Sequence, residues 1–425
     1  MINVNDFAAA SDSETIERAL ANLQGDRILV IPPRESSIQP ERKSWLLDRA
    51  ILLPGDTTLI LRNCTIKLSD RCRDNFIRSA NCGMGISFPE RIRNIHIIGE
   101  GSCTLEGADH PRAVGDSSKI LACPCPYTQE DLCRLAYWIP EEFRSPEKIR
   151  WWDMHDHSYG TDAGKEGESQ YGDWRGIGVL LANVENFSIE NLRIVDSHGW
   201  GISLEACAFG RVEKIHFDAC MSKMIDGMLH NMENQDGIDL RNGCHHILIS
   251  DITGHTGDDV VALTAIAGDE VRPGGVERST HVMHSDWTKR EKDIHDIIIR
   301  NIMAYSQLCF GVRLLPVNTQ IRNVIIDGVI DTRPADNRHG GTILLGEADS
   351  GYGVNLPDGM KNITISNVIC DADWAILLAG YLVDSTITNV VNRNPDCPVI
   401  HVERENGLNN VLTSNLSSCG GALID

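Results

Sequence analysis

The sequence has few basic residues for its size and no long apolar run, and each of these absences excludes a class of protein. Lys and Arg together number 39 against 60 Asp and Glu, which gives a formal net charge of −21 and a pI near 5.1. Because phosphate binding needs clustered Lys and Arg, this balance disfavours nucleic acid and anionic membranes as partners. No stretch approaches the roughly 20 apolar residues that cross a bilayer. A small or neutral ligand fits this composition better.

We expect neither a leader segment nor a disulfide framework from this sequence. It begins Met1-Ile2-Asn3-Val4-Asn5 with no charged and then apolar stretch. The 14 cysteines belong to a chain of 425 residues, far too long for a disulfide-stapled miniature domain. We therefore expect reduced thiols in a cytoplasmic protein.

One group of cysteines is a candidate metal site. Cys123-Pro124-Cys125 and Cys133 lie close together in the sequence, but no second Cys or His pair stands at the spacing of a zinc site. We predict no metal and no cofactor.

Helical periodicity is nearly absent after residue 30, and a short phrase recurs in its place. The phrase is an Asn or Asp, an apolar residue, one further residue, a second apolar residue, and then another Asn or Asp followed by an apolar residue. It appears at 94–99, 186–192, 246–252, 296–302, 323–329 and 362–368. Each copy alternates apolar and polar residues, which is typical of a short strand with one buried face. The spacing is irregular, roughly 25 to 50 residues, as in repeats with inserted loops.

These strands favour a solenoid over other β folds. A doubly wound sheet needs a helix between parallel strands, and those helices are missing. Sandwiches and propellers remain possible, but the recurring Asn is better explained by side chains that stack from coil to coil and hydrogen-bond to neighbouring turns. We predict an all-β fold, a right-handed parallel β-helix.

We predict a single domain over residues 1–425. Residues 1–26 would form an N-terminal cap, because 11–23 read as one amphipathic helix that could cover the open end of the apolar core. Residues from about 110 to 175 break the rhythm with Pro-rich, acidic and Trp-rich sequence, and we interpret them as an inserted loop region. Residues 408–425 would form a last partial coil.

Three acids are the strongest functional signal. Asp236 lies in Asn234-Gln235-Asp236-Gly237, and Asp258-Asp259 follow 22 positions later, about one coil of a solenoid. Parallel strands lie about 4.8 Å apart, so these carboxylates would meet on one patch of surface. Like charges that close favour keeping one proton, which makes an acid and a base from identical side chains. A proton donor and a water-activating base are what glycosidic bond cleavage requires.

At these residues the chain resembles glycoside hydrolase family 28, the polygalacturonase-type β-helix enzymes. That family carries Asn-Thr-Asp, Asp-Asp, Gly-His-Gly and Arg-Ile-Lys motifs on successive coils. Asn234-Gln235-Asp236 resembles the first, Gly257-Asp258-Asp259 the second, and Gly311-Val312-Arg313-Leu314-Leu315 the fourth. The resemblance implies that Asp258 is the general acid and that Asp236 and Asp259 hold or activate the water.

The sequence departs from the family at two motifs. Gly-His-Gly is missing, and His281 or His284 could supply the imidazole instead. Leu315 stands where the family has the Lys that helps to bind the sugar carboxylate, while Arg313 is retained. An apolar side chain cannot replace a compact positive charge, so we expect polygalacturonate to be a poor substrate.

Two further residues are candidates for substrate binding. His198 and Trp200 lie about one coil before Asp236, and a Trp beside a glycan acid often stacks on sugar. Either could equally be a core residue.

We therefore expect a cytoplasmic glycosidase that inverts configuration and acts on an oligosaccharide or polysaccharide other than polygalacturonate. The alternatives are a β-helix fructosyl transferase that forms an intramolecular product, a non-catalytic carbohydrate-binding solenoid, and a Ca²⁺-dependent lyase, since three acids could bind Ca²⁺. The sequence does not indicate an oligomeric state.

Overall fold

The computed structural model describes most of the chain. The described residues are 1–25, 27–36, 39–72, 74–83, 86, 89–111, 149–151, 174–225, 227–232, 234–267, 271–272, 276–277, 292–335, 337–338, 340–347 and 354–425. Most of the predicted insertion, the cysteine group at 123–133, and both His281 and His284 lie outside these residues. Within them, no helix is long and apolar enough to span a membrane.

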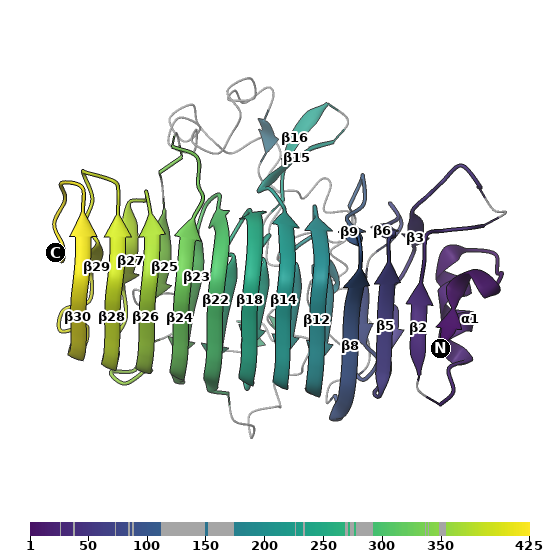
Figure 1. Cartoon of the computed structure of the whole chain (residues 1–425), viewed down its shortest axis with the longest axis horizontal. Coiled ribbons are helices and arrows are strands. Elements are labelled where there is room, and N and C mark those ends of the chain that lie inside the picture. Colours follow the sequence, from purple (N-terminus) through teal and green to yellow (C-terminus); the bar gives the residue numbers. More distant parts are fainter. Residues whose placement is uncertain are drawn as a thin grey trace.

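Two parallel sheets run the length of the molecule, side by side along its long axis (Figure 1). The long sheet follows the order β1 (Ile2–Asn3), β2 (Ile28–Ile31), β5 (Thr57–Arg62), β8 (Ile92–Glu100), β12 (Val184–Val195), β14 (Ala208–Asp218), β18 (His245–Thr256), β22 (Ile294–Ser306), β24 (Ile321–Asp331), β26 (Met360–Cys370), β28 (Leu382–Asn392) and β30 (Leu408–Ser418), with β3 (Trp45–Leu47), β6 (Thr65–Leu68) and β9 (Thr104–Glu106) at its side. The short sheet follows the order β4 (Ile51–Leu53), β7 (Ile77–Ser79), β11 (Val179–Ala182), β13 (Ile202–Glu205), β17 (Ile238–Arg241), β19 (Val261–Ile266), β23 (Phe310–Val317), β25 (Gly341–Leu345), β27 (Trp374–Leu378) and β29 (Ile400–Val402). Because the strands of the two sheets alternate along the chain from β11 to β30, the chain is a parallel β-helix, as the sequence predicts.

The structure also contains smaller elements outside the two main sheets. A three-stranded sheet joins β10 (Ile149–Trp151), β15 (Ser222–Ile225) and β16 (Met228–Asn231), and β20 (Val271–Arg272) pairs with β21 (Val276–Glu277). The short 3-10 helices are η1 (Val4–Asp6) and η4 (Trp174–Gly176).

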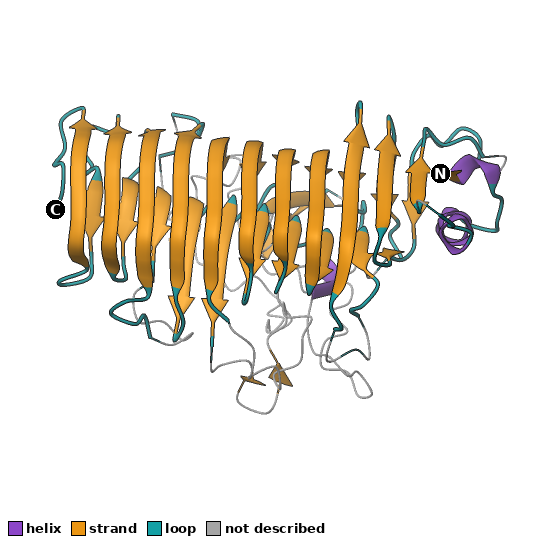
Figure 2. Cartoon of the chain, turned by 60° about the horizontal axis from the view of Figure 1, so that its bottom comes forward, coloured by secondary structure: helices purple, strands orange, loops and turns teal. Residues whose placement is uncertain are grey.

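The helix α1 (Asp12–Ala21) lies at the N-terminal end of the sheets (Figure 2). Ser11 begins it, because the Ser11 side chain accepts a hydrogen bond from the Glu14 amide (3.2 Å). Ile16 and Ala19 are buried in the main core. That the helix protects the end of the core, as the sequence predicts, remains a prediction.

The core consists of residues stacked from coil to coil between the sheets. One column of the long sheet shows the pattern: its inward side chains are Ile189, Val212, Ile249, Ile299, Ile326, Ile365 and Ile387, each paired with the next. β-Branched side chains suit a pleated surface that is buried on one face, so the repeated phrase builds a continuous core.

Two columns of left-handed residues explain the polar positions of the phrase. The first contains Asp56, Asn94, Asn186, Phe209, His246, Asp296, Asn323, Asn362, Asp384 and Asn410, all with φ between 49° and 59°. The second lies five residues further along each strand and contains Asn191, Lys214, Asp251, Asn301, Asn367, Asn389 and Asn415. Asn and Asp tolerate this conformation better than other residues with a Cβ.

The side chains of both columns bond from coil to coil. Asn186 Nδ2 donates to Asn94 Oδ1 (2.7 Å), and Asn323 Nδ2 donates to Asp296 Oδ1 (2.8 Å). Asn415 Nδ2 donates to Asn389 Oδ1 (2.9 Å) in the second column. The predicted stacking of Asn side chains is confirmed.

Candidate active site

The three predicted acids lie just before adjacent strands of the short sheet. Asp236 precedes β17, while Asp258 and Asp259 precede β19. Ile238 pairs with Val261, and the Gly237 amide donates to the Asp259 carbonyl (2.8 Å). The acids therefore lie on neighbouring coils, as predicted, with Asp259 directly beside Asp236.

The backbone holds these two coils close together. A Cβ at Gly237 would lie 2.4 Å from the Val260 carbonyl oxygen, so only glycine allows this approach. The amides of Gly257 and Asp258 both donate to the Gln235 carbonyl, at 3.1 and 3.2 Å. The position of the acids is thus fixed by main-chain contacts.

Asp259 has a partner on each carboxylate oxygen. The Phe310 amide donates to Oδ1 (3.0 Å), and Arg313 Nη1 donates to Oδ2 (3.3 Å). Arg313 Nη2 also donates to Glu347 (2.6 Å). Burial raises the pKa of Asp259 to about 7 against the opposing effect of Arg313. This carboxyl group is therefore anchored.

Asp236 is buried but less fully bonded. It is 6% exposed, and among the residues that the structure describes no donor reaches its Oδ1. Burial raises its pKa well above the ordinary value, and the charges of Asp239, Asp258 and Asp259 raise it further. An oxygen that is buried and lacks a donor is costly, so this carboxyl group is a candidate for contact with a bound molecule.

Asp239 is a site residue that the sequence prediction missed. It lies between core residues Ile238 and Leu240, so the alternation of a strand points it away from the core. It is nonetheless 1% exposed, and burial raises its pKa while Arg241 lowers it. The polar residue in Ile238-Asp239-Leu240 is the signal that could have revealed it.

Asp258 is the most accessible of these acids, being only half-buried. Its Oδ1 accepts a hydrogen bond from the Asp259 amide (2.9 Å). Asp258, Asp259 and Cys309 offer ligand atoms within 4.8 Å of one another. Burial raises the pKa of the Cys309 thiol well above its usual value, which keeps it protonated. Two carboxylates beside a neutral thiol do not suit Ca²⁺, which takes six to eight oxygen ligands.

The placement of Arg313 corrects the sequence assignment. We assigned residues 311–315 to the fourth motif of the family, two coils after Asp258-Asp259. However, β19 pairs directly with β23, and Ala262 lies opposite Arg313. Arg313 is thus on the next coil, where the family has Gly-His-Gly. Leu315 packs with Ile266 and Val317 in a separate apolar cluster.

Aromatic residues flank the pair Asp236 and Asp259 along the same row of coils. The Gly201 amide donates to the Asp236 carbonyl (2.8 Å), which places Trp200 on one side, and Phe310 lies on the other. Both residues are half-buried, and each packs against a small apolar cluster. The Arg241 guanidinium lies 4.7 Å from the centre of the Trp200 ring. The sequence prediction missed Phe310.

Of the other predicted binding residues, one is buried in the interior and one lies in the turn before Asp236. His198 is 1% exposed, and its Nε2 accepts a hydrogen bond from the Ala108 amide (2.8 Å). Burial lowers its pKa to about 3, so it is a neutral interior residue, and the prediction that it binds substrate is not supported. Asn234 has a left-handed backbone (φ 53°) that turns the chain into Asp236.

These features define a class of protein by its fold. The chain is a parallel β-helix of the kind found in polygalacturonases. No protein-family model matches the sequence, and no curated protein matches it.

Three solved structures are similar along nearly the whole chain. A polygalacturonase from Erwinia carotovora ssp. carotovora is 14% identical with a TM-score of 0.55, and the match covers 99% of this chain and 95% of that one. A family 28 exopolygalacturonase from Yersinia enterocolitica is 12% identical with a TM-score of 0.51, covering 100% and 77%. An endo-xylogalacturonan hydrolase from Aspergillus tubingensis is 14% identical with a TM-score of 0.51, covering 100% and 94%. At these identities the similarity establishes the fold.

Proposed function

We propose that this protein is an inverting glycoside hydrolase that acts on a neutral or singly charged oligosaccharide. The observation that carries the proposal is the pairing of a half-buried Asp258 with a buried Asp236 on the neighbouring coil. The fold shared with polygalacturonases and a xylogalacturonan hydrolase supports it.

The contacts of each carboxyl group suggest its role. Asp258 is accessible, so it serves as the general acid that protonates the leaving oxygen as the glycosidic C–O bond breaks. Asp236 has an oxygen free of donors within the described residues, so in its ionised form it serves as the base that takes a proton from water. The resulting hydroxide adds to the anomeric carbon from the opposite face. Asp259, held by Phe310 and Arg313, positions the other two.

The spacing of the acids favours Asp236 over Asp259 as the base. Asp258 and Asp259 approach within 4.8 Å. Inverting enzymes separate acid and base by about 6.5 to 9.5 Å so that a water fits between them. The closeness of Asp259 to Asp258 disfavours it as the base and leaves Asp236 for that role.

The charges of the site argue for a substrate without a high negative charge. Arg313 already pairs with Asp259 and Glu347, so little of its positive charge is left for a sugar carboxylate. Asp236, Asp239 and Asp258 add further acids nearby. Trp200 and Phe310, both half-buried, offer aromatic rings for the apolar face of a neutral sugar.

A glycan panel tests this function directly. Purified protein is incubated with neutral oligosaccharides, aryl glycosides and polygalacturonate, and the products are separated and their reducing ends measured. We expect new reducing ends from a neutral or singly charged substrate, little release from polygalacturonate, and no loss of activity with EDTA. A cyclic or non-reducing product would instead indicate intramolecular transfer. Binding without turnover across the panel would indicate a carbohydrate-binding solenoid.

A further inference from the structure

The first column of left-handed residues is interrupted on the outer face of the long sheet. Asn and Asp occupy the column from Asp56 to Asn186 and again from Asp296 onward, but Phe209 and His246 fill the two coils between. A bulky residue such as Phe is a rare occupant of this conformation, and strained backbone of this kind tends to occur where function requires it. The interruption is therefore a place to look for a second site.

A groove of about 400 Å³ lies at this interruption. It is lined by Phe209, Arg211, His246, Asp296 and neighbouring residues of five adjacent strands. Arg211 is paired with Glu190 and Glu213, so its charge is already balanced. The groove lies on the long sheet, whereas the candidate active site lies on the short sheet.

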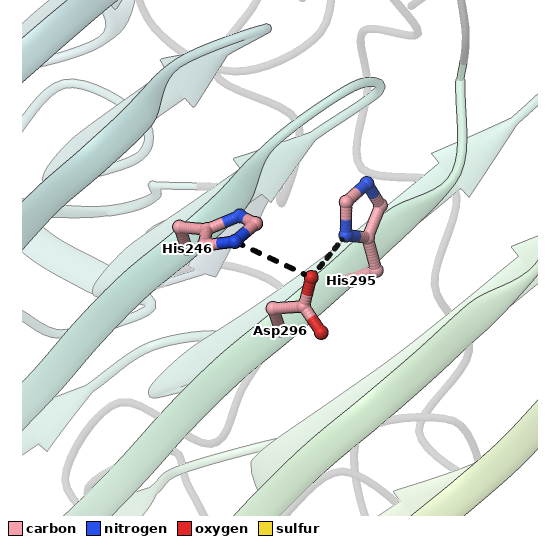
Figure 3. A group of neighbouring side chains, drawn as sticks. All are labelled: His246, His295 and Asp296. Carbon is pink, nitrogen blue, oxygen red and sulfur yellow. Dashed lines mark hydrogen bonds and ion pairs between the residues drawn. The ribbon is translucent and has the colours of Figure 1, made fainter.

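Three metal-binding side chains meet at the edge of this groove, and two of them, His246 and Asp296, line it. His246 on β18 and His295 with Asp296 on β22 present ligand atoms within 4.8 Å of one another. His295 Nδ1 lies 2.7 Å and His246 Nε2 lies 3.7 Å from Asp296 Oδ2 (Figure 3). Both rings thus point at the same carboxylate oxygen.

Neighbouring groups orient these three side chains. Asn323 Nδ2 donates to Asp296 Oδ1 (2.8 Å), which leaves Oδ2 to face the rings. His245 and His246 share a hydrogen bond between their Nδ1 atoms (2.9 Å), which turns His246 Nε2 toward Asp296. The His245 ring also stacks on His295, with ring centres 4.9 Å apart. Such outer partners fix ring orientation in metal sites.

We propose that His246, His295 and Asp296 form a site for a divalent transition-metal ion such as Zn²⁺, which joins two neighbouring coils. Two imidazoles and one carboxylate suit the ions from Co²⁺ to Zn²⁺. Ligands around tetrahedral Zn²⁺ lie roughly 3.3 Å apart, given bonds of about 2.0 to 2.1 Å. Small side-chain rotations achieve this spacing, because His246 is 47% exposed and lies only 3.7 Å from Asp296 Oδ2. Binding displaces the proton between His295 and Asp296.

The metal would link two strands whose ligands lie far apart in the sequence. Residues 246 and 295 lie on adjacent strands of the long sheet but are separated by the whole coil that carries β19 and the loop after it. An ion that binds only the folded protein stabilises it. The ion's remaining positions would be filled by water or by a ligand in the groove.

The substitution His246→Asn tests the site without endangering the fold. Asn favours the left-handed backbone and matches the rest of the column, but its amide is a poor ligand for Zn²⁺. We expect wild-type protein to bind Zn²⁺ in calorimetry and to melt at a higher temperature with it. His246→Asn and His295→Gln should each lose one equivalent or bind it at least about tenfold more weakly, since even outer-shell changes cost that much.

Two control variants make the test specific. His216 is exposed on the same sheet and bonds Thr253, so His216→Gln should bind Zn²⁺ as wild type does. Cys309→Ser removes a ligand from a second group of the described residues that could hold a metal, and should also leave this binding unchanged. Equal Zn²⁺ binding by wild type and His246→Asn, or an equal loss in His216→Gln or Cys309→Ser, would overturn the proposal.

Discussion

The outer faces of the two sheets have opposite chemistry. On the long sheet, Asn and Asp repeat in two columns and satisfy one another from coil to coil. On the short sheet, Asp236, Asp239 and Asp259 are buried next to one another, and burial raises the pKa of each. The first arrangement lowers the free energy of the fold, while the second raises it. Buried like charges persist where chemistry needs them, so the comparison assigns the candidate catalytic site to the short sheet.

The largest expected effect is the loss of turnover in Asp258→Asn. The amide keeps the shape of the side chain but cannot give a proton, so we expect activity to fall at least about a hundredfold. The melting temperature should stay nearly unchanged. Asp251→Asn makes the same chemical change on the long sheet and should retain full activity. Initial rates on the best substrate of the glycan panel measure both variants, and an active Asp258→Asn would mark this residue as a structural turn.

The next effect is on stability, through Arg313→Met. Removing the cation leaves the buried Asp259 without its charged partner, and breaking a buried pair of this kind costs about 3 kcal/mol. The loss should be largest above pH 7, where Asp259 is ionised in the wild type, and smaller at pH 5.

A surface pair provides the control for that loss. Arg338 pairs with Asp371 at a more exposed position, so Arg338→Met should cost less than about 1 kcal/mol. Urea unfolding at both pH values compares the two variants. Equal losses of stability in the two variants would mean that the buried pair contributes no more than the surface pair.

Asp236→Asn is expected to have a smaller effect on stability, and this effect depends on pH. The folded-state pKa of Asp236 is raised, so its contribution to stability is fully present below about pH 4 and is lost as the pH rises through the folded-state value. The amide does not ionise. Asp236→Asn should therefore match wild type near pH 4 and be more stable at pH 8.

On the long sheet, the opposite dependence of stability on pH is expected for Asp384. Asn410 and Lys361 lower the pKa of Asp384, so Asp384→Asn should gain nothing as the pH rises. Thermal melts at pH 4 and pH 8 measure both variants. If wild type melts at a higher temperature than Asp236→Asn at pH 8, the burial of Asp236 does not destabilise the fold.

The sequence predicted the long sheet better than the site. The phrase with two Asn or Asp positions marks strands because left-handed residues recur five positions apart, a local property that one sequence reveals. Asp236, Asp258 and Asp259 were found from their spacing. Phe310 and Glu347 come from later coils, and their approach depends on coil lengths that the sequence leaves open. For the same reason, the sequence analysis assigned Arg313 to a coil one beyond the coil on which it lies.

The smallest effect concerns the second column of the long sheet. Lys214 has a left-handed backbone (φ 57°) between Asn191 and Asp251. Lys214→Asn suits this conformation and extends the stack, so it should stabilise the fold by about 1 kcal/mol. Lys361 lies outside both columns and pairs with Asp384, so Lys361→Asn should give no gain. Urea unfolding measures both, and no gain in Lys214→Asn would mean that the stacked column contributes little.

The anomeric form of the first product tests the central claim most directly. If Asp258 and Asp236 act as acid and base across a water, the substrate found in the glycan panel is hydrolysed in one displacement. Proton NMR within the first minutes should then show the anomer opposite to that of the bond cleaved. Release of the same anomer as in the substrate would mean a covalent intermediate and would contradict the assignment of Asp236 as the base.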